Sequence, residues 1–158
     1  MNYEKLALAV GFDHAAVMPV SELVIVPEYR KYCEMNYCGN YDKVASCPSH
    51  CGTVAQMLAK MIVYNSALVM QSTHEVDNVF DRKEQNKLEA KHNIMTEAVH
   101  KLMKEDGIKD SLFMSAGPWK GNSCLSAYCI NAQKMAEYVN MDCWLDDGKS
   151  RFFSLILF

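Results

Sequence analysis

Four cysteines lie close together in one short stretch of the chain, CEMNYCGNYDKVASCPSHC. Intervals of four, eight and three residues separate Cys33, Cys38, Cys47 and Cys51. Four thiolates are the ligands that a tetrahedral Zn²⁺ ion or a [4Fe–4S] cluster requires. The glycine, asparagine and proline residues between them allow the chain to turn back on itself. The segment therefore predicts a metal site on which the four sulfurs converge.

The spacing of these cysteines leaves the metal open. It has neither the paired C-x2-C of zinc ribbons nor the C-x2-C-x2-C run of bacterial ferredoxins. His50 lies between Pro48 and Cys51 and could replace one thiolate, which would give the Cys3His site that zinc often uses. Two interpretations without metal are buried apolar thiols and redox-active dithiols. The cofactor expected from the residues is an iron–sulfur cluster (4Fe-4S) or zinc.

Three further cysteines follow later in the chain. Cys124 and Cys129 come after the glycine-rich turn SAGPWKGNSC, and Cys143 is expected to be an ordinary core thiol. In a parallel sheet this turn and the first cysteine segment would leave carboxyl ends of strands on the same edge. Cys124 and Cys129 would then form a second site or contact a ligand beside the first, with Trp119 as a wall and Lys120 facing an anion. The alternative is that both cysteines only pack.

Composition and charge limit the class of protein. The chain has 158 residues, half of them hydrophobic, and a net charge of −3, which gives no support to nucleic acid as a partner. No apolar run reaches the roughly 20 residues of a membrane span, and the first residues do not resemble a signal peptide. We therefore expect a cytoplasmic location. An odd count of seven cysteines also argues against a disulfide framework.

Hydrophobic periodicity predicts a single α/β domain over residues 1–158, with a mixed or mostly parallel sheet flanked by helices and a cysteine-rich metal-binding loop. Helices are expected at 2–11, 52–61, 76–106 and 131–139. Strands are expected at 14–20, 21–26, 65–72, 111–117 and 152–158. The last of these, FFSLILF, is uniformly apolar and should lie at or near the centre of the sheet. His74, His92 and His100 are expected to be solvated.

Several ordered segments resemble one known family, the uncharacterised domain-of-unknown-function family 2284, described as a predicted metal-binding protein. CGNYDKVASCPSHC resembles its signature C-x-N-Y-x-K-x-x-x-C-P-x-x-C. The segments GFDHAAVMPVSELVIVPEYRKYC, SAGPWKGNSC and AEYVNMDCWLDDGKSRFFSLILF resemble its entry segment, its Gly-Pro turn and its closing helix and strand. The resemblance extends along nearly the whole chain, and its specific part is the cysteine signature.

The resemblance implies metal binding through Cys38, Cys47 and Cys51, with Cys33 as the fourth ligand, and implies no established reaction. The chain departs from the family pattern at Trp119, where relatives tend to have a cysteine. If relatives build a second site at this turn, part of it is missing here.

Three classes of function remain open from the sequence. The first is an iron–sulfur protein in electron transfer or a reductase system, which the dense cysteine segment favours narrowly. The second is a structural zinc-binding module of an interaction or scaffold protein, and the third is a thiol redox sensor. The expected partner is a redox partner protein or a small-molecule ligand, with no nucleic acid and no membrane.

Overall fold

A computed structural model describes all of residues 1–158. The helices are α1 (Tyr3–Val10), α2 (Arg30–Glu34), α3 (Val54–Met61), α4 (Arg82–Glu105) and α5 (Ala132–Tyr138), with two short 3-10 helices, η1 (Val20–Glu22) and η2 (Pro27–Tyr29). The strands are β1 (His14–Pro19), β2 (Ser66–Glu75), β3 (Leu112–Met114) and β4 (Lys149–Leu157). No helix combines the length and the apolar character needed to cross a membrane.

The four strands form one sheet in the order β1-β2-β4-β3, and every neighbouring pair is antiparallel. The prediction of a mixed or mostly parallel sheet is therefore wrong, although helices and strands do alternate in an α/β arrangement. The predicted strand at 21–26 is also wrong, because this segment contains the 3-10 turn η1 and only one isolated bridge, between Ile25 and Ile130.

The position of β4 explains why the parallel sheet was expected and does not form. The long helix α4 connects β2 to β3, and these two strands run in the same direction because each is antiparallel to β4. They are not neighbours, since β4 inserts between them. The prediction that residues 152–158 form a central strand is confirmed, and the apolar run is buried on both faces as a central strand should be.

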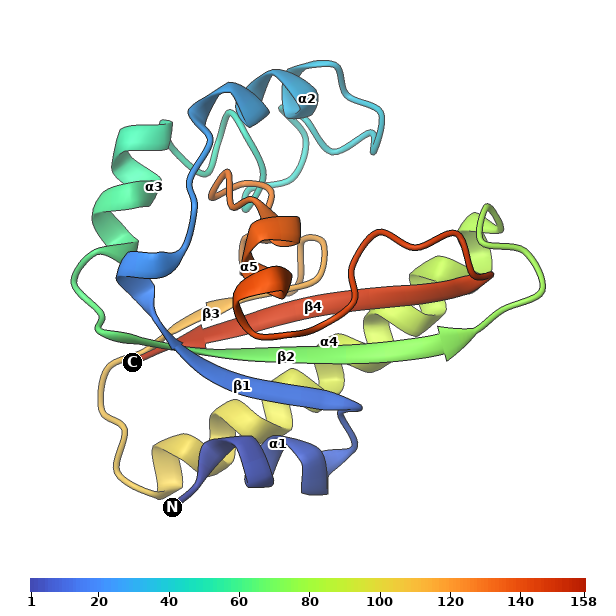
Figure 1. Cartoon of the computed structure of the whole chain (residues 1–158). Coiled ribbons are helices and arrows are strands. Elements are labelled where there is room, and N and C mark those ends of the chain that lie inside the picture. The colour runs from blue at the N-terminus through green and yellow to red at the C-terminus, as the bar shows by residue number, and fades with distance from the viewer.

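Helices cover both faces of the sheet, as Figure 1 shows. On one face α1 and α4 pack against Leu68, Met70 and Ile156. Side chains of alternate residues in β2 and β4 point to the opposite face, where a larger core lies beneath α3 and α5. The segment that carries the first four cysteines crosses above this second face, between α2 and α3 (Figure 1).

Helix α4 begins six residues later than its apolar pattern predicts. The side chain of Asp81 accepts a hydrogen bond from the backbone N–H of Glu84, and this cap fixes the start of the helix. Phe80, expected on the helical face, is exposed. His92 is fully buried, so the expectation that it is solvated is wrong.

Candidate metal centre

A cavity of about 450 Å³ lies between the second face of the sheet and the cysteine loop, which we define as residues 33–51. The loop forms one wall, and the turn that follows β3 forms another, through Gly117, Pro118 and Cys124. Residues from the first half of β4 close the far end. The turn and the loop therefore come together as expected, but the reason was wrong, because no parallel strands bring them to one edge.

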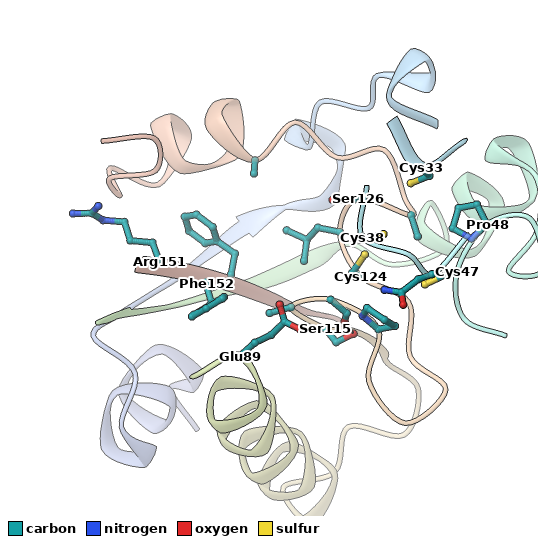
Figure 2. A pocket seen from close by; sticks show the side chains of 18 of the residues that line it. Cys33, Cys38, Cys47, Pro48, Glu89, Ser115, Cys124, Ser126, Arg151 and Phe152 are labelled. Atoms are coloured by element: carbon teal, nitrogen blue, oxygen red, sulfur yellow. Dashed lines mark hydrogen bonds between the residues drawn. The ribbon is translucent and has the colours of Figure 1, made fainter. Parts of the chain in front are cut away.

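Four thiols gather at one end of this cavity, and we call them the thiol cluster: Cys33, Cys38, Cys47 and Cys124. Figure 2 shows the four side chains facing the same region, at the end opposite Arg151 and Phe152. Three of them come from the cysteine loop, and Cys124 comes from a segment more than 70 residues later in the chain. The structure thus adds Cys124 to three of the four cysteines that the sequence singled out.

The thiol cluster does not have the arrangement of a site for one metal ion. No three Cys, His, Asp or Glu side chains are gathered as the ligands of a single metal ion would be. The four sulfurs predicted from the sequence accordingly do not converge on one ion position. Cys51 does not line the cavity, and its side chain packs against the hydrophobic core.

Burial and mutual repulsion hold the thiols of Cys33 and Cys47 in the neutral form. Burial raises the pKa of Cys47 to about 12, and the charges of Cys124 and Cys38 add to the rise. Burial likewise raises the pKa of Cys33 to about 11, with Cys124 adding to it and Arg30 opposing it. Since each thiolate disfavours the next, several can ionise together only if positive charge is bound between them. The electrostatics of the cluster therefore suit a metal group.

The contacts of Arg30 show whether the residues around the thiol cluster suit a negatively charged metal group. Its Nη1 and Nη2 atoms donate to the carbonyl oxygens of Gly52 (2.7 Å) and Ala127 (2.9 Å). Its Nε atom is buried without a hydrogen-bond partner. Arg30 begins α2 one helical turn before Cys33. A half-buried guanidinium beside neutral thiols lacks a counter-charge, and metal-bound thiolates would supply one together with a sulfur acceptor for the buried Nε atom. The residues present fit a negatively charged metal–thiolate group.

The cysteine loop is held in shape by its own hydrogen bonds. Asp42, at a positive φ of 57°, accepts two hydrogen bonds from Ser49, and its backbone N–H donates to the carbonyl of Pro48 (2.9 Å). The Ser49 hydrogen bonds lower the pKa of Asp42. His50 Nε2 lies 3.0 Å from the Asp42 carbonyl oxygen, and His50 does not line the cavity. The His50 ring therefore contacts the backbone of the cysteine loop and does not face the cavity that the thiol cluster lines.

The turn after β3 is fixed from below by α4. The buried side chain of Asn93 both accepts a hydrogen bond from the backbone N–H of Ala116 (2.9 Å) and donates to its carbonyl (2.8 Å). Ser115 Oγ donates to the carbonyl of Gly117. Gly117 has a φ of +63°, and a Cβ there would collide with the carboxylate of Glu89. These contacts place the segment that leads to Cys124 against the cavity.

The other residues expected near a second site do not line the cavity, although Cys129 is close enough for its charge to act on Cys33 and Cys51. Trp119 Nε1 donates to Glu97 (2.8 Å), and the Lys120 ammonium pairs with the same carboxylate (3.2 Å), so neither side chain lines the cavity. Cys129 is fully buried, and its backbone carbonyl accepts from Val26. The backbone around Cys129 therefore fastens the chain that precedes α2.

Sequence reasoning missed three residues around the cavity. Cys143, expected in the core, is half-buried on the cavity wall, where the charge of Arg151 acts on it. Arg30 lies three residues before Cys33, a helical spacing that could have suggested a contact. Glu89 gave no such signal, since it is one acidic residue among many on a polar helix.

Comparison with known families gives one match, to the family described as "Predicted metal-binding protein (DUF2284)", over residues 16–124. The matched range contains the cysteine loop and ends at Cys124, so it includes all four residues of the thiol cluster. Comparisons with curated proteins and with solved structures find no match. Because the matched range is well over half of the chain, the protein belongs to domain-of-unknown-function family 2284, the predicted metal-binding proteins.

Proposed function

We propose that this metal-binding protein holds an iron–sulfur cluster of the [4Fe–4S] type through Cys33, Cys38, Cys47 and Cys124, and that it acts in electron transfer or in a reductase system. The observation that carries the proposal is the thiol cluster itself: four thiols around one end of a cavity, beside the half-buried Arg30, whose buried Nε atom lacks an acceptor. When bound, such a cluster accepts and donates single electrons.

The arrangement of the thiols favours a cluster over a single zinc ion. Four thiolates that share one Zn²⁺ ion must all lie about 2.3 Å from a common point. In a [4Fe–4S] cluster each thiolate binds a different iron, so the four sulfurs lie farther apart around a larger body. Four thiols that line one cavity, with no three gathered as for one ion, suit the second arrangement better.

The chain's own residues would supply three things to the bound group. The four cysteines hold it as thiolates, and Arg30 offsets part of their negative charge from the α2 side. The turn that Asn93 fixes from α4 orients Cys124. The cysteine loop and this turn together form the walls of the thiol end of the cavity.

Anaerobic purification, with iron, sulfide and zinc analysis and a visible spectrum, tests the proposal. We expect a brown protein with about four irons and four sulfides per chain. A colourless protein that contains stoichiometric zinc would contradict the proposal and support a structural zinc module.

Single serine substitutions test the ligand set. Cys124→Ser should lose most of the iron, because it removes a thiolate from the cluster. Cys51→Ser should retain the iron, since Cys51 does not line the cavity. Cys143→Ser is a matched control, because Cys143 lies on the same cavity wall but beside Arg151. Loss of iron in Cys51→Ser with retention in Cys124→Ser would instead support the ligands predicted from the sequence.

A further inference from the structure

The cavity continues beyond the thiol cluster into a second part, which we call the chamber. It is bounded by the aromatic side chains of Trp144, Phe152 and Phe153 and by Glu89. Phe152 lies on the far side of the cavity from the thiols, and Glu89 reaches in from α4 beside Ser115 (Figure 2). Trp144 is 79% exposed and stands at the rim. The cavity has a volume typical of sites for small organic molecules.

Glu89 reaches this side of the sheet because the edge strand β3 has only three residues. Where β3 stops, the α4 side chain passes the end of the strand and meets the turn at Gly117. The half-buried carboxylate forms no hydrogen bond and no ion pair with another residue of the chain, and burial alone raises the pKa of Glu89. The Glu89 carboxylate oxygens are therefore free to accept hydrogen bonds from a ligand.

The charges of the chamber select the kind of ligand. Arg151 is its only basic residue, and its Nη1 and Nη2 atoms donate to Asp147 at 3.0 Å and 2.6 Å. This ion pair cancels the positive charge and occupies both nitrogens. The negative charge of Glu89 therefore has no partner in the chamber. Any thiolates at the other end of the cavity add further negative charge. An anion would be repelled here, whereas a cation would be attracted.

We propose that the chamber binds a planar aromatic molecule with a cationic nitrogen group, whose N–H donors meet Glu89 and whose ring packs against Phe152 on the α4 face of β4, the face from which Glu89 enters. Phe153 and Trp144 border the chamber from the other face of β4. Aromatic side chains bind a cation through their faces as well as burying the ring, so both parts of the ligand find a complement. This site goes beyond the proposed cluster and does not depend on it.

Benzamidine is a suitable probe, because its amidinium can donate two hydrogen bonds to one carboxylate. Calorimetric titration of the anaerobically purified protein should give saturable binding at one site. Acetamidine, which lacks the ring, and benzoate, which reverses the charge, should each bind at least about tenfold more weakly, as expected for the loss of one charged hydrogen bond or of the ring contact.

Variants locate the site. Glu89→Gln keeps the shape of the side chain and should weaken benzamidine binding at least about tenfold, and Phe152→Ala should weaken it as well. Glu105→Gln is the matched control, because Glu105 lies on the same helix, is exposed and pairs only with Lys101. Circular dichroism verifies that each variant is folded.

The proposal is overturned if benzamidine does not bind, if benzoate binds equally well, or if a folded Glu89→Gln variant binds benzamidine as tightly as the unaltered protein. Iron is measured in the same sample. Absence of iron would contradict the proposed cluster, while Glu89-dependent binding of benzamidine would still support the chamber.

Discussion

Arg30 places a permanent positive charge at the side of the thiol cluster, and its effect belongs to the scale of single residues. A buried cation and an N–H donor near a cluster stabilise the reduced form, which carries one more negative charge. The guanidinium cannot lose its proton, so this influence does not change with pH in the physiological range.

We therefore expect Arg30→Gln to lower the reduction potential of the bound cluster by several tens of millivolts, since a tenfold change in the redox equilibrium corresponds to about 59 mV for one electron. A redox titration followed by visible absorbance measures the shift. Lys31→Gln is the matched control, because Lys31 is the next residue of α2 and is exposed. An unchanged potential in Arg30→Gln would show that Arg30 has only a structural role.

The sequence predicts individual site residues only where several residues of one type lie close together along the chain. Cys33, Cys38, Cys47 and Cys51 stood out because four soft ligands in one turn-rich loop have few other uses, although Cys51 does not line the cavity. Cys124 could be grouped with them only by a guess about folding, since the distance along the chain carries no information about contact. Arg30 and Glu89 depend on three-dimensional neighbours, and common charged residues offer no pattern to detect.

At the scale of elements, the turn after β3 shows how a glycine can be required for two different reasons. Gly117 and Gly121 both have a positive φ, of 63° and 82°. Any other residue at either position bears the cost of the left-handed backbone, roughly 1–2 kcal/mol. Only Gly117 also lies against another side chain, because a Cβ there would collide with Glu89, whereas a Cβ on Gly121 would meet open space.

The two glycines therefore form a matched pair for mutation. Gly121→Ala should lower the free energy of unfolding by roughly 1–2 kcal/mol, and Gly117→Ala by slightly more, because only the second must also displace the flexible end of the Glu89 side chain. Urea denaturation of both variants measures the difference. Equal losses would mean that Glu89 moves aside without cost.

Most elements could be predicted from local pattern, and the exceptions have local causes. The helices at 3–10, 54–61 and 132–138 and the strands at 14–19 and 66–75 follow hydrophobic periodicity and their caps. The segment 21–26 is apolar enough for a strand, yet η1 turns the chain away from the sheet directly after β1. The Asp81 cap likewise overrides the apolar residues before α4.

At the scale of the whole molecule, the two faces of the sheet contact different kinds of groups: one face borders the cavity, and the other carries buried polar side chains. On the face of α1 and α4, a buried polar chain joins helix to sheet. His92 Nδ1 lies 2.6 Å from Ser72 Oγ on β2, and its Nε2 lies 2.9 Å from Ser154 Oγ on β4. Ser154 in turn bonds Thr96 (2.7 Å). These bonds fix α4 above the two central strands.

The burial of His92 makes global stability depend on pH. Burial, with a smaller contribution from His74, lowers the pKa of His92 from 6.5 to about 3. The unfolded chain therefore binds a proton at this residue between pH 6.5 and 3, while the folded chain does not. The stabilising effect is complete above pH 6.5 and decreases as the pH falls through that window.

We expect the free energy of unfolding to fall by up to about 1.4 kcal/mol per pH unit below pH 6.5 on account of His92. His92→Asn should flatten this slope and also lower stability at pH 7 by roughly 1–3 kcal/mol, because buried hydroxyls lose a partner. Urea denaturation at several pH values measures both effects. The exposed His14 offers a control, and a slope that His92→Asn leaves intact would refute the assignment.

The direction of the strands could not be predicted from the sequence. Periodicity identifies a strand and the faces that it buries, but not its neighbours. The pattern β2-α4-β3 is typical of two parallel strands joined by a helix. Here β4, separated from the end of β3 by the 34 residues 115–148, takes the place between them, and only the complete set of contacts specifies that insertion.

The insertion of β4 also sets an order of events during synthesis of the chain. All four cysteines of the thiol cluster emerge from the ribosome before residues 149–157, which complete the sheet beneath them. Until then β3 has no partner strand, and the turn that carries Cys124 has no fixed place. The nascent protein thus exposes loose thiols for the time needed to translate its last strand. Incorporation of a metal group into the finished site proposed here would therefore follow that step.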